Sequence, residues 1–203
     1  MKNKYVFILL SVFTISCQFV QDEYIQSIEQ ERKAKDSIFR IESESPLIVE
    51  QINNFEGLKY FPVDKKYRVK ARLDRVDSGT VIKMRTSTDR SPDYKIYGHI
   101  HFELDKKACQ LTVYQNLAHQ SDSLYSNLLF VPFTDDNSII LTYGGGRYID
   151  FEIPESDTFF LDFNKAYNPY CAYNHKWSCV IPPPENSLRI AVNAGEKNYK
   201  TPY

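Results

Sequence analysis

The sequence has almost no net charge. Its 203 residues include 25 Lys and Arg against 26 Asp and Glu, which gives a formal net charge of −1. Domains that bind nucleic acid usually carry a strongly basic patch, so the composition predicts no nucleic-acid partner. The phosphate-binding pattern G-x-x-x-x-G-K-[ST] is also missing, which removes the common nucleotide-binding loop.

Motifs for catalysis and metal binding are absent as well. The chain has no catalytic-triad motif, no acidic pair at a telling spacing and no Cys-x2-Cys knuckle of the kind found in zinc sites. The sequence therefore assigns no catalytic residue and no metal ligand, and it leaves cofactor and ligand unknown.

Glycine is scarce, with 7 residues in the chain, and three of them form the run 144–146. Aromatic residues are abundant, with 15 Tyr and 13 Phe. Aromatic and β-branched side chains suit the pleated surface of a sheet. The length and the 42% hydrophobic content are enough for one domain with its own core.

No apolar run reaches the roughly 20 residues that a membrane-spanning helix needs. The N-terminus instead has Lys2 and Lys4 before the apolar run 5–14, as in a secretory signal. The sequence Thr-Ile-Ser-Cys at 14–17 resembles a bacterial lipobox, although Thr14 stands where Leu is typical. The alternative is an ordinary signal peptide that is cut nearby.

From this pattern we predict a signal peptide over residues 1–16 and a lipid on Cys17. The lipid would hold the protein to a membrane without spanning it. We therefore expect a membrane-anchored lipoprotein of the cell envelope, facing the periplasm or lying at the cell surface. Its membrane partner would be reached through the lipid on Cys17.

Residues 17–44 are polar, and their apolar positions have only partial helical spacing. We interpret this segment as a partly helical tether that docks weakly, because Arg32 and Lys35 interrupt the apolar stripe. A short helix should follow, with Ser45 as N-cap, Pro46 at its first position and Gly57 at its end. The domain would then occupy residues 45–203.

After this helix the hydrophobic period changes from 3.6 to 2. About nine short strands follow at hairpin spacing, without helices between them. This pattern predicts a single antiparallel all-β domain, either a barrel or a sandwich. The expected strands cover residues 67–73, 80–85, 94–105, 109–115, 128–133, 139–143, 147–153, 158–163 and 187–192.

The four cysteines are Cys17, Cys109, Cys171 and Cys179. If Cys17 carries a lipid, three remain, so an exported domain forms at most one internal disulfide. Cys171 and Cys179 are close in sequence and would close a nine-residue loop, whereas Cys109 lies in an alternating strand pattern. This favours a Cys171–Cys179 pair and leaves Cys109 as a buried free thiol. Reduced thiols, a metal site and a nucleophile paired with His175 are the alternatives.

The stretch 142–186 concentrates residues with special chemistry. Its glycine run followed by Arg147 fits either a cradle for an anionic ligand or a tight turn whose arginine pairs with an internal acid such as Asp150 or Asp162. Asn164 and Asn168 fit either an Asn-pinned loop or a polar binding site. Trp177 is the single tryptophan and fits a loop anchor or a ligand platform.

His99 and His101 lie two residues apart, so both side chains point to the same face of their expected strand. A His-x-His pair on a strand can hold a metal ion. Lys95, Tyr97 and Glu103 share that face, however, and this composition favours a solvated polar surface.

Four segments resemble a family of uncharacterised bacterial and archaeal proteins, domain-of-unknown-function family 1684. They are FPVDKKYRV at 61–69, TYGGGRYIDFEIP at 142–154, LDFNKAYNPYCAYNHKWSCVIPPPEN at 161–186 and VNAGEK at 192–197. The resemblance covers residues 45–197. It implies no particular activity, and Lys165 departs from the arginine expected there. If members without export signals keep Cys171 and Cys179, the resemblance implies a role for them other than a disulfide.

Together these patterns predict an envelope lipoprotein whose β-domain binds a small ligand or a partner without catalysis. One alternative is a small hydrolase-like or metal-dependent enzyme using His175 with Cys171 or Cys179. A purely structural envelope protein is the third possibility. The expected ligand-binding residues are Tyr143, Gly145, Arg147, Asn164, Asn168, His175 and Trp177.

Overall fold

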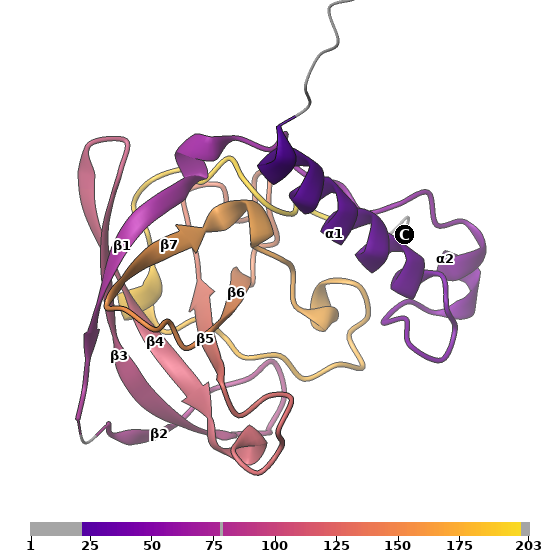
Figure 1. Cartoon of the computed structure of the whole chain (residues 1–203). Helices are drawn as coiled ribbons and strands as arrows, with labels where there is room; N and C mark the ends of the chain where they lie inside the picture. The colour runs from indigo at the N-terminus through magenta and orange to yellow at the C-terminus, as the bar shows by residue number, and fades with distance from the viewer. Residues whose placement is uncertain (1–21, 78, 200–203) are drawn as a thin grey trace, which may run out of the picture.

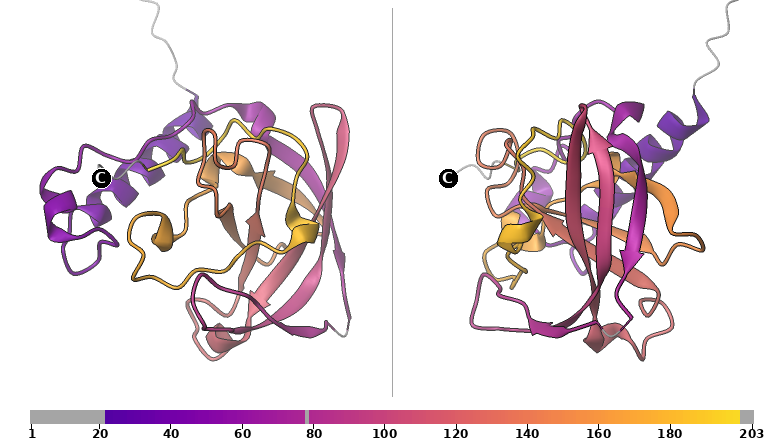
Figure 2. Two further views of the ribbon diagram at one scale, coloured as in Figure 1. Left: turned by 180° about the vertical axis from the view of Figure 1, so that it is seen from behind. Right: turned by 90° about the vertical axis from the view of Figure 1, so that its left-hand side faces the viewer.

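An antiparallel sheet of seven strands curls into a half-barrel in the computed structural model (Figures 1 and 2). The structure describes residues 22–77 and 79–199, so the expected signal peptide and Cys17 lie outside the described residues. Strand order is β6-β5-β4-β3-β1-β7, and β2 pairs with β3. The strands are β1 (Arg68–Arg75), β2 (Val81–Lys83), β3 (Asp93–Leu104), β4 (Lys107–Asn116), β5 (Leu128–Phe133), β6 (Arg147–Glu152) and β7 (Thr158–Asp162).

The long hairpin β3–β4 shows how the alternating pattern sets the fold. Ile100, Phe102 and Leu104 are buried on one face of β3, as the period of two predicts. A two-residue loop joins the strands, and Asp105 and Lys106 both have positive φ there, 48° and 63°. Such a loop matches the right-handed twist of the strands it connects.

The sequence predicted two strands that the structure does not contain. At 139–143 the chain turns: Ile139 has φ 79°, and Ile140 N–H donates to Asn137 O at 3.0 Å. At 187–192, an isolated bridge of Ser187 to Thr134 replaces a ladder. The apolar residues of this last segment are buried because they fill the concave side of the sheet, not because they belong to it.

The expected barrel or sandwich is confirmed only as an all-β architecture. Strands β6 and β7 stand at the two ends of the strand order, and the structure shows a curled half-barrel. The main core lies inside this curl. It combines side chains of the strands with Phe163, Leu188, Ile190 and Val192 from the irregular C-terminal chain.

Helix α1 (Glu23–Phe39) packs against the half-barrel and is not weakly docked. Ile28 and Phe39 are buried. Arg32 donates to Phe61 O at 3.0 Å and Asn164 O at 3.3 Å, and Lys35 pairs with Glu196. The two charged residues expected to interrupt docking are therefore the ones that tie the helix down.

Helix α2 (Val49–Asn53) is shorter than predicted and begins after Ile48. Ser45 Oγ accepts from Leu47 N–H at 3.2 Å in a local turn, and Asn54, not Gly57, is the C-cap. Short 3-10 turns complete the chain: η1 (Lys65–Tyr67), η2 (Leu117–His119), η3 (Phe163–Lys165), η4 (Tyr170–Ala172) and η5 (Pro184–Asn186). None of the helices in the described ranges is long and apolar enough to cross a membrane.

Candidate functional site

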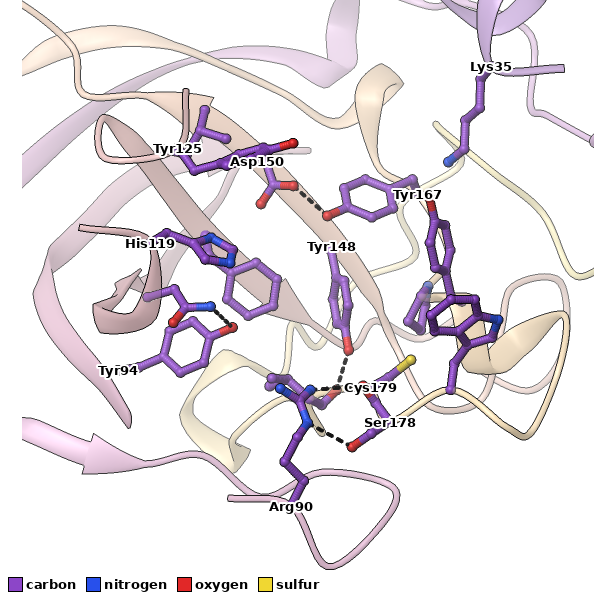
Figure 3. Close-up of a pocket in the computed structure, with 17 residues that line it drawn as sticks. Lys35, Arg90, Tyr94, His119, Tyr125, Tyr148, Asp150, Tyr167, Ser178 and Cys179 are labelled. Atoms are coloured by element: carbon purple, nitrogen blue, oxygen red, sulfur yellow. Dashed lines mark hydrogen bonds between the residues drawn. The ribbon is translucent and has the colours of Figure 1, made fainter. Parts of the chain in front are cut away.

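A cavity of about 530 Å³ lies between one face of the sheet and the chain around residues 167–180 (Figure 3). Its volume falls within the range of small-molecule sites, roughly 300–1,000 Å³. Lys35 of α1 and His119 of η2 also line this cavity. Aromatic rings make up much of the rest: Tyr94, Tyr125, Phe130, Tyr148, Tyr167, Tyr170 and Trp177.

Strand alternation explains how the sheet supplies this wall. On β5, Leu129 and Val131 point into the main core, so Leu128 and Phe130 point to the cavity. On β6 the cavity side carries Tyr148 and Asp150, and Asp150 pairs with Phe130 across the ladder. Strands β5 and β6 therefore face the main core on one side and the cavity on the other.

The aromatic rings support one another mostly at right angles. Phe130 meets Tyr148 with ring centroids 4.8 Å apart and planes at 76°, and Tyr148 meets Tyr167 at 5.7 Å and 90°. Tyr170 and Trp177 form a further edge pair at 5.3 Å. Edge-to-face contact is favourable for aromatic rings and fixes their orientation. The wall is therefore pre-organised.

Asp150 is the acidic group of the cavity. Its side chain is exposed to solvent at the cavity, although many protein atoms lie around the carboxyl. It accepts a short hydrogen bond from Tyr167 Oη. Burial raises the pKa of Asp150 above its ordinary 3.8, and the Tyr167 hydrogen bond, Lys35 and His119 oppose this rise. A carboxyl with a raised pKa in a cavity is typical of functional sites.

We predict that Asp150→Asn does not destabilise the protein at neutral pH. The folded carboxyl keeps its proton to higher pH than the unfolded one, so wild-type unfolding free energy falls as pH rises above 3.8. The asparagine side chain does not titrate, so the variant lacks this decrease of unfolding free energy with pH. Urea unfolding of both proteins from pH 3.5 to 7 measures the decrease, with Asp136→Asn at an exposed position as control. A variant with the wild-type pH slope would contradict the prediction.

Arg90 is the basic group opposite. Its Nε donates to Ser178 Oγ at 3.1 Å and its Nη2 to Ser178 O at 2.9 Å, which holds the guanidinium at the cavity. In the part of the chain that the structure describes, Arg90 forms no ion pair. Lys35, by contrast, is neutralised by Glu196.

Of the residues that the sequence predicted for ligand binding, Trp177 lines this cavity, and its indole Nε1 donates to Pro46 O at 3.3 Å. Asn164 lies in a second, smaller cavity of about 180 Å³ beneath α1. Its amide is occupied there, because it donates to Asp64 O and Tyr24 Oη and accepts from Asp64 N–H. Asn164 is thus a loop-pinning residue.

Arg147 does not line the large cavity but lies inside the domain, 1% exposed. It pairs with Asp135 and not with Asp150 or Asp162. Its guanidinium also donates to the carbonyl oxygens of Val192 (3.0 Å), Glu196 (3.2 Å) and Ala194. Every one of these partners is protein, so the geometry gives Arg147 the internal pairing that was the alternative to a ligand contact.

The glycine run before it forms a tight turn in which Gly146 N–H donates to Tyr143 O at 3.0 Å. Gly146 has φ 87°, and a Cβ there would lie 2.5 Å from Pro182. A side chain on Gly145 would meet the Tyr143 ring. These contacts are those of a turn and not of an anion cradle.

The remaining predicted residues do not form one site with Trp177. Asn168 is buried, and its side chain donates to Lys197 O at 2.8 Å. His175 is exposed. Tyr143 is half-buried, with its hydroxyl 3.7 Å from Cys171 Sγ. Neither His175 nor Tyr143 lines the cavity.

Cys171 and Cys179 lie side by side as free thiols, with Cys171 N–H donating to Cys179 Sγ at 3.0 Å. Cys179 faces the cavity. A hydrogen bond from Cys179 lowers the pKa of Cys171 to about 7. The spacing predicted a disulfide, which stays a prediction, and Cys109 is a half-buried free thiol.

The histidine pair on β3 has ordinary partners. His101 Nε2 lies 3.1 Å from Asp74, and His99 Nδ1 lies 3.2 Å from Thr112 Oγ1. Among the described residues, no group of three or more His, Cys, Asp or Glu side chains is arranged to hold a metal ion.

Sequence reasoning missed most of the cavity: Arg90, Tyr94, His119, Phe130, Tyr148, Asp150 and Tyr167. A signal was present in β5 and β6, where large side chains occupy both faces. A strand with two apolar faces must be covered on both, and Asp150 is the acid on the second face. The His119 and Arg90 loops carried no comparable pattern.

The fold and the cavity define an antiparallel half-barrel domain with a ligand-sized, aromatic-lined site. The chain belongs to the family described as protein of unknown function DUF1684, whose model matches residues 53–197. A solution NMR structure of an uncharacterised protein from Haloarcula marismortui is similar, with TM-score 0.68 and 35% identity. The match covers 86% of this chain and 94% of that one. No curated protein matches the sequence.

Proposed function

We propose that this protein is a non-catalytic binding domain for a small molecule, held at a membrane by a lipid on Cys17. The cavity is the observation that carries the binding part. It combines pre-oriented rings with a few polar groups, as ligand sites do. His175 is exposed and does not line the cavity, which favours binding over the Cys–His enzyme alternative.

Trp177 makes the binding hypothesis directly testable. It is the single tryptophan of the chain and it lines the cavity. A ligand that enters therefore changes the emission of one known residue. Screening a library of small metabolites against Trp177 fluorescence should find compounds that shift or quench it in a saturable way.

We predict that Tyr170→Ala weakens binding of such a compound about tenfold while leaving the fold intact. Tyr170 lines the cavity, and its own side chain is 40% exposed, so truncation removes ligand contact with a small loss of core packing. Phe160→Ala, an exposed aromatic on β7, is the matched control. Equal affinities of both variants and wild type would place the ligand elsewhere.

The membrane part of the proposal rests on the N-terminal sequence, which resembles a signal peptide followed by a lipobox. We predict that Cys17→Ser in the native host abolishes incorporation of labelled palmitate and releases the protein from the membrane fraction. Cys109→Ser, at a half-buried thiol of the domain, is the control and should leave labelling unchanged. Membrane retention of the Cys17 variant would refute lipid anchoring.

Helix α1 connects the two parts of the proposal. It begins at Glu23, soon after the proposed lipid site, and its Lys35 lines the large cavity. Because α1 is fixed to the half-barrel, the domain would be held close to the membrane and not on a long free tether. This placement favours a ligand that is met at the membrane surface.

A further inference from the structure

The polar groups that the cavity leaves free define what it can bind. Several tyrosine hydroxyls already have protein partners. Tyr148 donates to Val180 O, Tyr167 donates to Asp150, and Tyr94 Oη accepts from Asn116 at 3.4 Å. These tyrosines therefore present mainly ring surface, which suits a flat apolar body.

Charge is found at two ends of this ring-lined space. Figure 3 shows Arg90 on one side of the Tyr148 ring and Asp150 on the other. The third charged side chain, Lys35, lies over the Tyr167 ring with its Nζ 4.7 Å from the ring centroid, and it is paired with Glu196. A ligand therefore meets one unpaired cation, and one carboxyl that keeps capacity to accept a hydrogen bond beyond Tyr167.

The hydrogen bonds that Arg90 already makes determine how it can contact an anionic ligand. Its Nε–H and one N–H of Nη2 are used by Ser178, which leaves both N–H groups of Nη1 and the second N–H of Nη2 free for a ligand. One N–H of Nη1 and the second N–H of Nη2 form a fork, which fits the two oxygens of a carboxylate. The two hydrogen bonds to Ser178 also restrain the Arg90 side chain, which lowers the entropy cost of binding a ligand there.

We propose that the cavity binds an aromatic carboxylate, with its acid group on Arg90, its ring among Phe130, Tyr148 and Trp177, and a hydroxyl donating to Asp150. This inference rests on the proposed binding function and specifies its ligand class. A cationic amine fits less well, because Arg90 would repel it. A purely apolar ligand would leave Arg90 without its counter-charge.

Calorimetric titration of the purified full-length chain with four probes tests the inference. The probes are 4-hydroxycinnamate, its neutral amide, cinnamate without the hydroxyl, and tyramine. The hydroxy acid should bind at least about tenfold more tightly than its amide, because the contact with Arg90 is charge-assisted. Cinnamate should bind several-fold more weakly than the hydroxy acid, and tyramine should bind most weakly.

Two variants assign these differences to residues. Arg90→Gln should remove the preference for the acid over the amide, and Asp150→Asn should reduce the preference for the hydroxylated acid. Arg85→Gln, an exposed arginine on the same segment, should leave all four affinities unchanged. If Arg90→Gln weakens acid and amide equally, Arg90 only fixes the Ser178 loop and the inference is overturned.

The test also separates this inference from the proposed function. Tighter binding of tyramine than of the acid would overturn the aromatic carboxylate but keep a binding cavity. The same holds if all four probes fail while the library screen yields neutral or cationic compounds that shift Trp177 emission. If no compound of either set perturbs Trp177, both the ligand class and the binding function are overturned.

Discussion

Replacing Arg147 with alanine lowers the free energy of unfolding by about 3–5 kcal/mol, the loss typical of breaking a buried ion pair at one partner. Arg147 is 1% exposed, and its partner Asp135 is equally enclosed. The substitution leaves the Asp135 carboxylate without its counter-charge. It also leaves the carbonyls of Val192, Ala194 and Glu196 without the guanidinium donors.

The expected loss of stability is large because Arg147 connects two parts of the chain that no strand pairing joins. It lies on β6, and its acceptors belong to the C-terminal chain that fills the half-barrel. Asp135 adds to this link by accepting Val192 N–H at 2.8 Å. The total free energy of unfolding of a domain is roughly 5–15 kcal/mol, so the expected loss is a large part of it.

Urea unfolding followed by circular dichroism measures the effect. Arg147→Lys should lose less than the alanine variant, because the charge remains while the planar fork is lost. Arg189→Ala removes an exposed arginine and should stay within about 0.5 kcal/mol of wild type. A small loss of stability for Arg147→Ala, combined with lost ligand binding, would instead support the ligand contact that the sequence suggested.

The strands that the sequence predicted well are those with one buried and one polar face. In β1 and over most of β3, alternation reports burial directly, and the structure follows it. Strand β4 departs from the pattern, because residues 111–114 are all buried. Residues 139–143 have the composition of a strand but do not form one, because β-branched residues do not reveal whether another strand is available to pair with them. Ile139 and Ile140 are 79% and 75% exposed in a turn. The segment 188–192 alternates because it fills a core and not because it pairs.

Charged residues were the main obstacle to predicting the site. In a sequence, Arg147 next to three glycines resembles an anion site, whereas its pairing with Asp135 depends on the fold. Arg32 and Lys35 resemble solvated positions, yet both are bound across the domain by partners at 61, 164 and 196. The sequence offered Trp177 as a loop anchor or a ligand platform, and in the structure Trp177 lines the cavity.

The second large effect is expected at Glu196. This carboxylate is 1% exposed and accepts from three directions. Asn168 N–H donates to Oε2 at 2.8 Å, Tyr173 Oη donates to the same oxygen at 2.6 Å, and Lys35 of α1 pairs with Oε1. Glu196→Ala should therefore cost about 3–5 kcal/mol, because it removes an ion pair and leaves two buried donors unsatisfied.

A second variant distinguishes the hydrogen bonds from Asn168 and Tyr173 from the ion pair with Lys35. In Glu196→Gln the single amide oxygen can still accept from Asn168 and Tyr173, while an NH₂ group faces the Lys35 ammonium. The glutamine variant should lose less stability than the alanine variant. Hydrogen exchange should nevertheless become faster in α1, because both variants remove the tie to Lys35.

Hydrogen exchange of residues 23–39, read with urea unfolding, distinguishes these outcomes. Glu155→Ala, at an exposed glutamate, is the control and should change neither measurement. Because Lys35 lines the cavity, loosening of α1 should also weaken ligand binding in the glutamine variant, although its fold is kept. Unchanged exchange in α1 would mean that Arg32, Ile28 and Phe39 hold the helix without Glu196, and the proposed link between anchor and cavity would then lose its main contact.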